Sequence, residues 1–299
     1  LELRNNNFVG SIPTQIANLG YALGYDDGEG TTHIDLAHGN LTGTVPSEIG
    51  YLEALKLLDL SNNPHLGLPV SDNPNLALNP PLPTELGLLT QLQSFNLDYS
   101  GFEGFVPTQI GQLSLLQHFF ARSKIRPHDP NTNRISGTIP TEVGKLKKLH
   151  TLGLSSNVIS GTLPAQIGEM DILRRLELEE NQLSGTMPDV FGTLRHIEYW
   201  DTYGNSLSGD LPNSIMNAST LEALYIQIEQ TGPLRNFQCG ERIPGLGNSH
   251  NDMKVPSSQA GAKYNWVLQA ADYFNMVYTT ACVDTAPAEY AFQALSGDV

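Results

Sequence analysis

The sequence predicts an α/β solenoid, a right-handed superhelix of short coils with a parallel sheet on its concave side. Three observations predict this fold. A Gly-x-hydrophobic-Pro motif recurs along most of the chain, its last four prolines are spaced by 24 residues, and apolar residues alternate upstream of the motif. The convex side is expected to hold short 3-10 or irregular segments, and a helical cap is expected at the C-terminal end.

Two adjacent copies show the repeated unit most clearly. Residues 152–164 read LGLSSNVISGTLP and residues 176–188 read LELEENQLSGTMP, so apolar residues, an asparagine, a glycine and a proline recur at fixed places. By this template, repeats begin near Leu1, Ile34, Leu58, Phe95, Phe119, Leu152, Leu176, Trp200 and Leu224. The sequence therefore predicts about nine stacked coils.

Each fixed position of the unit has a physical role. The alternating apolar residues predict a short strand with one face turned inward, and strands of successive coils are expected to pair in parallel. An asparagine that follows the strand can satisfy backbone groups of its own and the neighbouring coil, which no apolar side chain can do. The turn asparagines are Asn6, Asn133, Asn157, Asn181 and Asn205. Gly39 and Ser100 stand at this position in two other coils, and Ala121 replaces an inward leucine.

The spacing also divides the chain into two regions. Residues 1–235 are expected to form the solenoid, with loop insertions near residues 26–33, 64–81 and 124–132. Surplus polar chain is tolerated there because it lies outside the packed stack.

Residues 236–299 follow a different pattern and are expected to cover the apolar face of the last coil. Ser257 and Ser258 are candidate N-caps for a helix near residues 258–280. Its apolar residues at three- to four-residue spacing are Trp266, Ala270, Phe274 and Val277.

The pattern LxLxxNxLxGxIPxxIGxLxxL resembles the plant-specific leucine-rich repeats of receptor-kinase ectodomains and polygalacturonase-inhibiting proteins. The resemblance covers roughly residues 1–235 and is specific, because many fixed positions recur in register. Similar repeats also occur in secreted proteins of algae and other protists. The resemblance implies an extracellular, secreted or cell-surface location and a ligand-binding surface on the concave side.

Two features bear on a secretory route. Cys239 and Cys282 flank the predicted cap and, in a secreted chain, most simply form one disulfide; two reduced core thiols are the alternative. The glycosylation sequons are Asn40-Leu-Thr42 and Asn217-Ala-Ser219, and a glycan on Asn40 is expected to project from the rim of the concave side.

Composition narrows the classes of partner. The formal net charge is -15 with a pI near 4.8, which argues against nucleic acid and against an anionic membrane surface. No apolar run is long enough to span a bilayer, so no direct membrane insertion is expected in this segment.

The sequence contains no motif typical of catalysis, of cofactor binding or of a dedicated metal site. The histidines show no metal-ligand spacing, and there is no GxSxG elbow, phosphate-binding loop or dinucleotide fingerprint. Residues 26–30, DDGEG, could bind Ca²⁺, although an exposed acidic insertion needs no ion. We therefore expect no enzyme activity, no cofactor and no dedicated metal site.

The outward strand residues are the candidate ligand-binding surface. They include a column of carboxylates interrupted by aromatic rings. The candidates are Asp35, His38, Asp59, Asp98, Tyr99, Phe120, Arg122, Glu177, Glu179, Glu180, Asp201, Tyr203 and Tyr225.

Two functions of different classes fit this surface. The first is recognition of a protein or peptide, with a glycan as a further option, where basic groups of the ligand meet the carboxylates and aromatic residues act as anchors. The alternative is a structural or adhesive extracellular scaffold that self-associates through its ends, edges and insertions.

Overall fold

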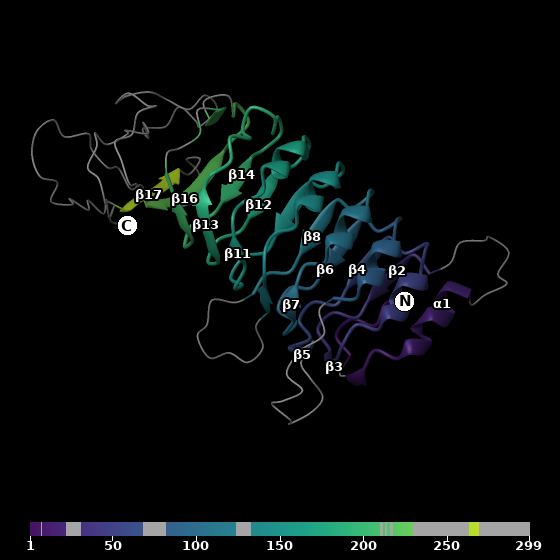
Figure 1. The fold of residues 1–299 in the computed structure, drawn as a ribbon. Coiled ribbons are helices and arrows are strands. Elements are labelled where there is room, and N and C mark those ends of the chain that lie inside the picture. Colours follow the sequence, from purple (N-terminus) through teal and green to yellow (C-terminus); the bar gives the residue numbers. More distant parts are fainter. Residues whose placement is uncertain are drawn as a thin grey trace, which may run out of the picture.

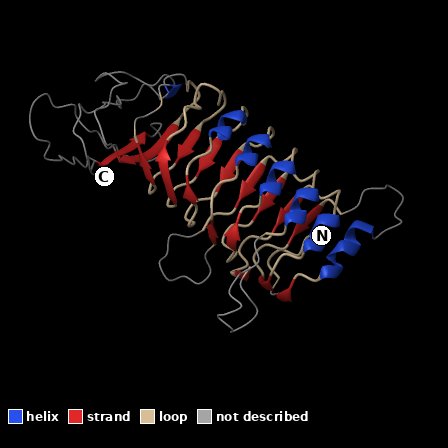
Figure 2. Cartoon of the chain, viewed as in Figure 1, coloured by secondary structure: helices blue, strands red, loops and turns tan. Residues whose placement is uncertain are grey.

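The structure is a computed structural model that describes residues 1–6, 8–21, 31–67, 82–123, 133–209, 212, 214–215, 218–229 and 263–268. It is an elongated stack of coils in which short strands line one side and short helices line another (Figures 1 and 2). The α/β solenoid expected from the sequence is confirmed.

The main sheet contains one strand from each coil. Its parallel strands are β2 (His33–Asp35), β4 (Leu57–Asp59), β6 (Ser94–Asn96), β8 (His118–Phe120), β10 (Thr151–Gly153), β12 (Arg175–Glu177), β14 (Tyr199–Asp201) and β16 (Ala223–Glu229). Near the N-terminus, Glu2 joins the edge of this sheet by an isolated bridge to Asp35. The inward residues Ile34, Leu58, Phe95, Phe119, Leu152, Leu176, Trp200 and Leu224 pair in one unbroken register, so the predicted repeat starts are correct for these coils.

Shorter strands follow the turn in each coil. They are β1 (Val9–Ser11), β3 (Asn40–Gly43) and β5 (His65–Leu66) in one sheet, β7 (Glu103–Phe105) and β9 (Arg134–Ser136) in a second, and β11 (Ser160–Gly161), β13 (Gln182–Thr186) and β15 (Ser206–Ser208) in a third group. The last group joins the main sheet because β16 pairs with β14 along its first half and with β15 along its second.

The return side of the coils holds a ladder of 3-10 helices. These are η1 (Thr14–Ala17), η2 (Ser47–Tyr51), η4 (Thr84–Leu88), η5 (Thr108–Gln112), η6 (Thr141–Lys145) and η7 (Ala165–Glu169), and η1 leads into the short helix α1 (Asn18–Tyr21). A proline in extended conformation precedes each 3-10 helix. Glycine is needed inside the ladder, because a Cβ on Gly111 would lie 2.6 Å from the carbonyl oxygen of Glu142 in the next coil.

One continuous hydrophobic core runs through the stack. The inward residues of the main sheet are almost fully buried, and the rings of Phe95 and Phe119 stack with centroids 5.4 Å apart. Burial of one such row per coil makes each coil depend on its neighbours for stability.

The turn asparagines cross-link adjacent coils, as the sequence predicted. Asn157 donates from Nδ2 to the carbonyls of Ala121, Leu154 and Ser155, and its Oδ1 accepts from the amide of Ile135. Asn133, Asn181 and Asn205 make the same kind of contacts.

Two turn positions differ from the prediction. Asn6 is exposed and bonds only to carbonyls of its own coil, because no described coil lies before it. Asn63 was not among the predicted turn asparagines, yet it is fully buried and links its coil to Leu36 and Leu41. Ser100 substitutes in part, since its hydroxyl donates to the carbonyl of Leu60.

The bounds of two predicted insertions were also wrong by a few residues. His33 begins β2, and His65 and Leu66 form β5, so these residues belong to regular coils because their backbones pair with neighbouring strands. The remaining residues of the three insertions lie almost entirely outside the described part of the chain.

The predicted C-terminal helix is wrong where the structure describes it. Residues 263–268 form β17 (Lys263–Leu268), which pairs antiparallel with β16. The physical reason is that β16 presents an open edge of amide and carbonyl groups, and the sequence KYNWVL is rich in aromatic and β-branched residues that favour strands. The rest of the predicted helix, Cys239, Cys282 and Asn217 lie outside the described residues.

Candidate functional site

The predicted outer column of the concave sheet is present in the structure. Backbone pairing places Asp35, Asp59, Asn96, Phe120, Gly153, Glu177, Asp201 and Tyr225 in one register across the strands from β2 to β16. A row in parallel register carries side chains at the strand spacing of about 4.8 Å, so residues of adjacent coils can interact directly.

Exposure along this face is uneven. His38, Glu180 and Tyr203 are exposed, whereas Asp98, Glu177 and Asp201 are only 4%, 7% and 7% exposed. These three carboxylates are therefore not simply solvated, because hydrogen bonds and ion pairs hold them against the sheet.

A local hydrogen bond orients the carboxylates of the column. The Oδ1 atoms of Asp35, Asp59 and Asp201 each accept from the backbone amide two residues further along, at 3.1, 2.9 and 3.0 Å. A short side chain at this place caps the turn that leaves the strand, a role that Asp and Asn perform well.

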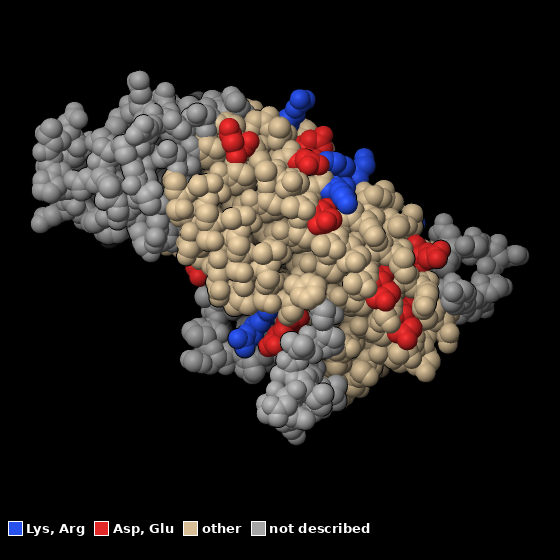
Figure 3. Space-filling view, viewed as in Figure 1, with Lys and Arg blue, Asp and Glu red and all other residues tan. Residues whose placement is uncertain are grey.

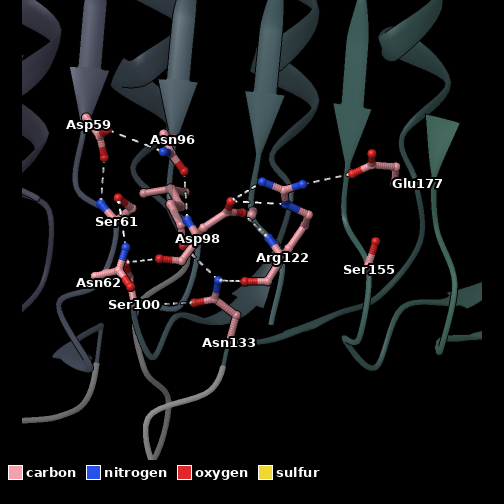
Figure 4. A network of polar contacts seen from close by, with 12 residues as sticks. Asp59, Ser61, Asn62, Asn96, Asp98, Ser100, Arg122, Asn133, Ser155 and Glu177 are labelled. Carbon is pink, nitrogen blue, oxygen red and sulfur yellow. Dashed lines mark hydrogen bonds and ion pairs between the residues drawn. The ribbon is translucent and has the colours of Figure 1, made fainter. Parts of the chain in front are cut away.

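Arg122 is the centre of the strongest polar network on the face (Figure 4). Its Nη2 lies 2.6 Å from Oδ2 of Asp98, and its Nη1 lies 3.0 Å from Oε2 of Glu177. Arg122 therefore ties the coil before it to a coil two positions after it. Burial disfavours its charge, but the hydrogen bond and charge of Asp98, with help from Glu177, prevail and raise the pKa of Arg122.

The reach from Arg122 to Glu177 depends on the residue between them. Gly153 occupies the column in the intervening coil, and a Cβ there would lie 3.3 Å from Cδ of Arg122 and 3.3 Å from Oε2 of Glu177. Because Gly153 has no side chain, Arg122 can reach across the coil of Gly153 and bind Glu177.

Aromatic rings stack with the arginines and with one another. The guanidinium of Arg122 lies 4.7 Å from the ring centroid of Phe120, and that of Arg175 lies 4.2 Å from the ring of Tyr199. Arg175 also donates to Oε1 of Glu177 at 2.8 Å. These cation–π and ion-pair contacts hold long side chains in one arrangement on the sheet.

A second, weaker network lies at the N-terminal end of the face. Arg4 contacts Asp35 at 3.0 Å and Asp59 at 3.4 Å, but its side chain is 51% exposed. Solvent screening makes this pair much less stabilising than the bonds of Arg122.

An acidic cluster occupies the C-terminal half of the face. Within the described ranges, Glu179, Glu180 and Asp201 form no ion pair, although Glu177 is paired twice. Burial and the nearby charge of Glu179 raise the pKa of Asp201 to about 7, and burial raises the pKa of Glu179. Burial and Asp201 likewise raise the pKa of the Tyr199 hydroxyl.

Several residues of this face were missed by the sequence analysis. Arg175, Tyr199 and His118 precede the inward residue of their strands, where the period of two also points side chains outward. His118 stacks between Phe120 and His150, and burial followed by the charge of His150 lowers its pKa. Strand alternation applied on both sides of the inward residue was the signal that could have found them.

The other predicted residues have simpler surroundings. His38, Tyr99 and Glu180 occupy the turn with positive φ of 56°, 57° and 55°. Tyr225 packs against Tyr199 with ring centroids 5.5 Å apart. Asn40 is exposed at the start of β3, shortly after the turn that leaves β2, and its glycosylation stays a prediction.

Figure 3 shows where charged side chains lie on one face of the molecule. In that view a broad uncharged area occupies the middle, and charged side chains lie mostly toward its margins.

In the described ranges, no group of three or more His, Cys, Asp or Glu side chains is arranged to hold a metal ion. No helix in these ranges has the length and apolarity required to cross a membrane.

The stacked coils, the asparagine cross-links and the ordered concave face define a leucine-rich-repeat solenoid. The Leucine Rich Repeat family model matches residues 173–194. A search of curated proteins found none that matches the chain.

Solved structures with the same fold include plant receptor ectodomains. The ectodomain of the Arabidopsis thaliana membrane receptor kinase GASSHO1/SCHENGEN3, in complex with CASPARIAN STRIP INTEGRITY FACTOR 2, is 28% identical over 73% of this chain and 23% of its own, with a TM-score of 0.59. The Arabidopsis receptor kinase HAESA, in complex with the peptide hormone IDA and the co-receptor SERK1, is 23% identical over 77% of this chain and 34% of its own, with a TM-score of 0.63.

A structure of a TDR receptor is also similar. It is 26% identical over 81% of this chain and 40% of its own, with a TM-score of 0.55. The present chain thus spans less than half the length of each of these three proteins.

Proposed function

We propose that this chain is a non-catalytic extracellular recognition module that binds a protein or peptide on its concave face. The observation that carries the proposal is the ordered outer surface of β2–β16, where charged and aromatic side chains are held in place by bonds between coils. Side chains that are already immobilised lose little conformational entropy when a ligand binds.

The chemistry of the face favours a peptide or protein over other partners. It combines aromatic rings with carboxylates that lack a counter-charge, which suits basic and apolar side chains of a polypeptide. The related ectodomain of GASSHO1/SCHENGEN3 supports this proposal, since its structure contains a bound partner. An extracellular, secreted or cell-surface location belongs to the same proposal.

The test uses the full chain and a displayed library of random peptides. Peptides selected on the unmodified protein are measured against Tyr203→Ala on the concave face and Tyr51→Ala on the 3-10 ladder, since both tyrosines are exposed, by 36% and 55%. Binding is expected to fall at least tenfold with Tyr203→Ala and to stay within twofold with Tyr51→Ala.

The opposite pattern, or equal binding to both variants, contradicts a concave ligand site. Tyr203 is chosen because its side chain takes part in no described ion pair or ring contact, so a loss of binding is separable from a loss of folding. Thermal unfolding of each variant provides the control.

A further inference from the structure

The C-terminal half of the concave face carries negative charge that the protein leaves unneutralised. Both arginines in reach are already engaged, Arg122 with Asp98 and Glu177, and Arg175 with Glu177. Glu179 and Asp201 form no ion pair within the described ranges, although each lies one coil or less from Arg175.

These two carboxyl groups are also poorly solvated. Asp201 is only 7% exposed, and the Oε2 atom of Glu179 is buried without a hydrogen-bond partner of ordinary geometry. Removal of a carboxylate from water without a cation is unfavourable, so a cationic group brought to this place gains a large electrostatic attraction.

The buried hydroxyl of Ser155 is a second observation that supports a ligand site near Glu179. Ser155 is 3% exposed, and its Oγ has no hydrogen-bond partner of ordinary geometry, although it lies close enough to Glu179 to favour the ionised carboxyl. In Figure 4 this hydroxyl is directed along the face toward Glu177. Buried polar atoms are nearly always bonded, so an unmatched one on a binding face is a natural acceptor for a ligand donor.

Aromatic rings stand beside the carboxylates. Tyr199 donates its hydroxyl to Oδ2 of Asp201 at 3.2 Å, and the ring of Tyr225 lies 5.5 Å from the ring of Tyr199. Arg175 already stacks on Tyr199, which shows that this ring accepts a guanidinium. Carboxylates next to aromatic rings bind planar organic cations through charge, hydrogen bonds and cation–π contact.

We propose that Glu179 and Asp201, together with Ser155 near Glu179 and with Tyr199 and Tyr225 near Asp201, form the subsite for an arginine side chain of the ligand. The inference rests on the proposed function and specifies the chemistry of its ligand. An arginine suits the site better than a metal ion, because the described residues include no group arranged to hold a metal. Its planar fork of donors matches two carboxyl groups and a hydroxyl.

The experiment titrates the full chain with acetyl-Gly-Arg-Gly-amide at pH 8 and follows the peptide by saturation-transfer NMR. The same peptide with citrulline in place of arginine is the neutral control of nearly equal shape. The arginine peptide is expected to bind at least tenfold more tightly than the citrulline peptide.

Variants locate the preference on the protein. Glu179→Gln combined with Asp201→Asn is expected to abolish the preference for arginine. Glu142→Gln combined with Glu169→Gln is the matched control, because it also removes two carboxylates but takes them from the 3-10 ladder, and it should leave the preference within twofold. Equal binding of both peptides, or a preference that survives the double substitution, overturns the subsite.

The pH dependence provides a second readout. Asp201 faces Glu177, Glu179 and Arg175 of the preceding coil, Tyr199 and Tyr203 of its own coil, and Tyr225 of the following coil. With a pKa of about 7, Asp201 is protonated at pH 5, so the affinity for the arginine peptide should rise between pH 5 and pH 8. An affinity that is constant or falls over this range contradicts the subsite.

Failure here is distinguishable from failure of the proposed function. If the arginine preference is missing while library peptides still depend on Tyr203, the concave face binds ligands of other chemistry. If library peptides are insensitive to Tyr203, the recognition function itself is wrong.

Discussion

Asn157 shows how many backbone groups a single side chain can bind in this protein. It is 7% exposed and makes four hydrogen bonds to backbone groups of two coils. Asn157→Ala is expected to lower the free energy of unfolding by about 2–4 kcal/mol, because several buried backbone groups lose their partners together. Chemical denaturation measures the change.

The control for this substitution is Asn6→Ala. Asn6 has the same place in the template but is exposed, so the loss should stay below about 1 kcal/mol. Similar losses at both positions contradict the cross-linking role of the buried asparagines.

Two arginines at the fourth place of their repeats differ in a similar way. Arg122→Met removes the cation from buried Asp98 and one of the two cations from Glu177, and it is expected to cost about 2–3 kcal/mol. Arg4→Met removes an exposed pair and should cost less than about 1 kcal/mol. Equal effects in denaturation experiments rule out a special structural role for the Arg122 network.

Asp201 makes the stability of the protein depend on pH. Its pKa of about 7 exceeds the value of roughly 4 in the unfolded chain, so the folded state holds a proton that the unfolded state has lost between these values. Stability should therefore fall as pH rises from 4 to 7, by at most about 1.4 kcal/mol per pH unit from this group. Asp201→Asn should reduce that slope in denaturation measured from pH 4 to 8, and an unchanged slope contradicts the assignment.

At the scale of the element, the turn that leaves each main strand imposes its own backbone geometry. The residue before the turn asparagine has positive φ in most coils, including Ser156 at 57° and Gly204 at 69°. Only glycine adopts this conformation without steric cost, so the other residues store a little strain there.

Reciprocal substitutions test this turn. Gly204→Ala is expected to destabilise the protein by about 1–2 kcal/mol, because the new Cβ is strained and lies 2.8 Å from the carboxyl group of Glu180. Ser156→Gly should change stability by less than about 1 kcal/mol, because relief of strain opposes the extra freedom of glycine in the unfolded chain. A stabilising Gly204→Ala result in thermal unfolding contradicts the argument.

At the scale of the whole molecule, stacking determines which parts of the chain are dispensable. Asn133 donates to the carbonyl of Arg122 just as Asn157 donates to that of Ser155, so the turn is built normally across the third insertion. Residues 119–123 joined directly to Asn133 recreate the regular LxLxxN pattern with alanine at its third place.

Deletion of residues 124–132 should therefore leave cooperative folding and the thermal midpoint unchanged or slightly improved, as a shorter loop costs less to close. Deletion of residues 158–166, an equal length within a regular coil, should prevent folding. Circular dichroism during heating distinguishes the two outcomes, and unfolding of the first deletion contradicts its role as an insertion.

The repeat starts, the inward rows and most of the turn asparagines could be predicted from the sequence alone. Those features depend on residues close together in the chain, and their periodic spacing allows only one arrangement of strand and turn. Even Asn63 was readable, because it stands at the sixth place of the unit that starts at Leu58.

Which outward side chains are buried, paired or left with unneutralised charge depends on how the coils stack. Arg122 and Glu177 are 55 residues apart and meet only because a single coil separates theirs and Gly153 in that coil has no side chain to block the contact. The strand at residues 263–268 likewise depends on the open edge of β16. Contacts of this kind follow from the distance between stacked coils, which local sequence periodicity does not encode.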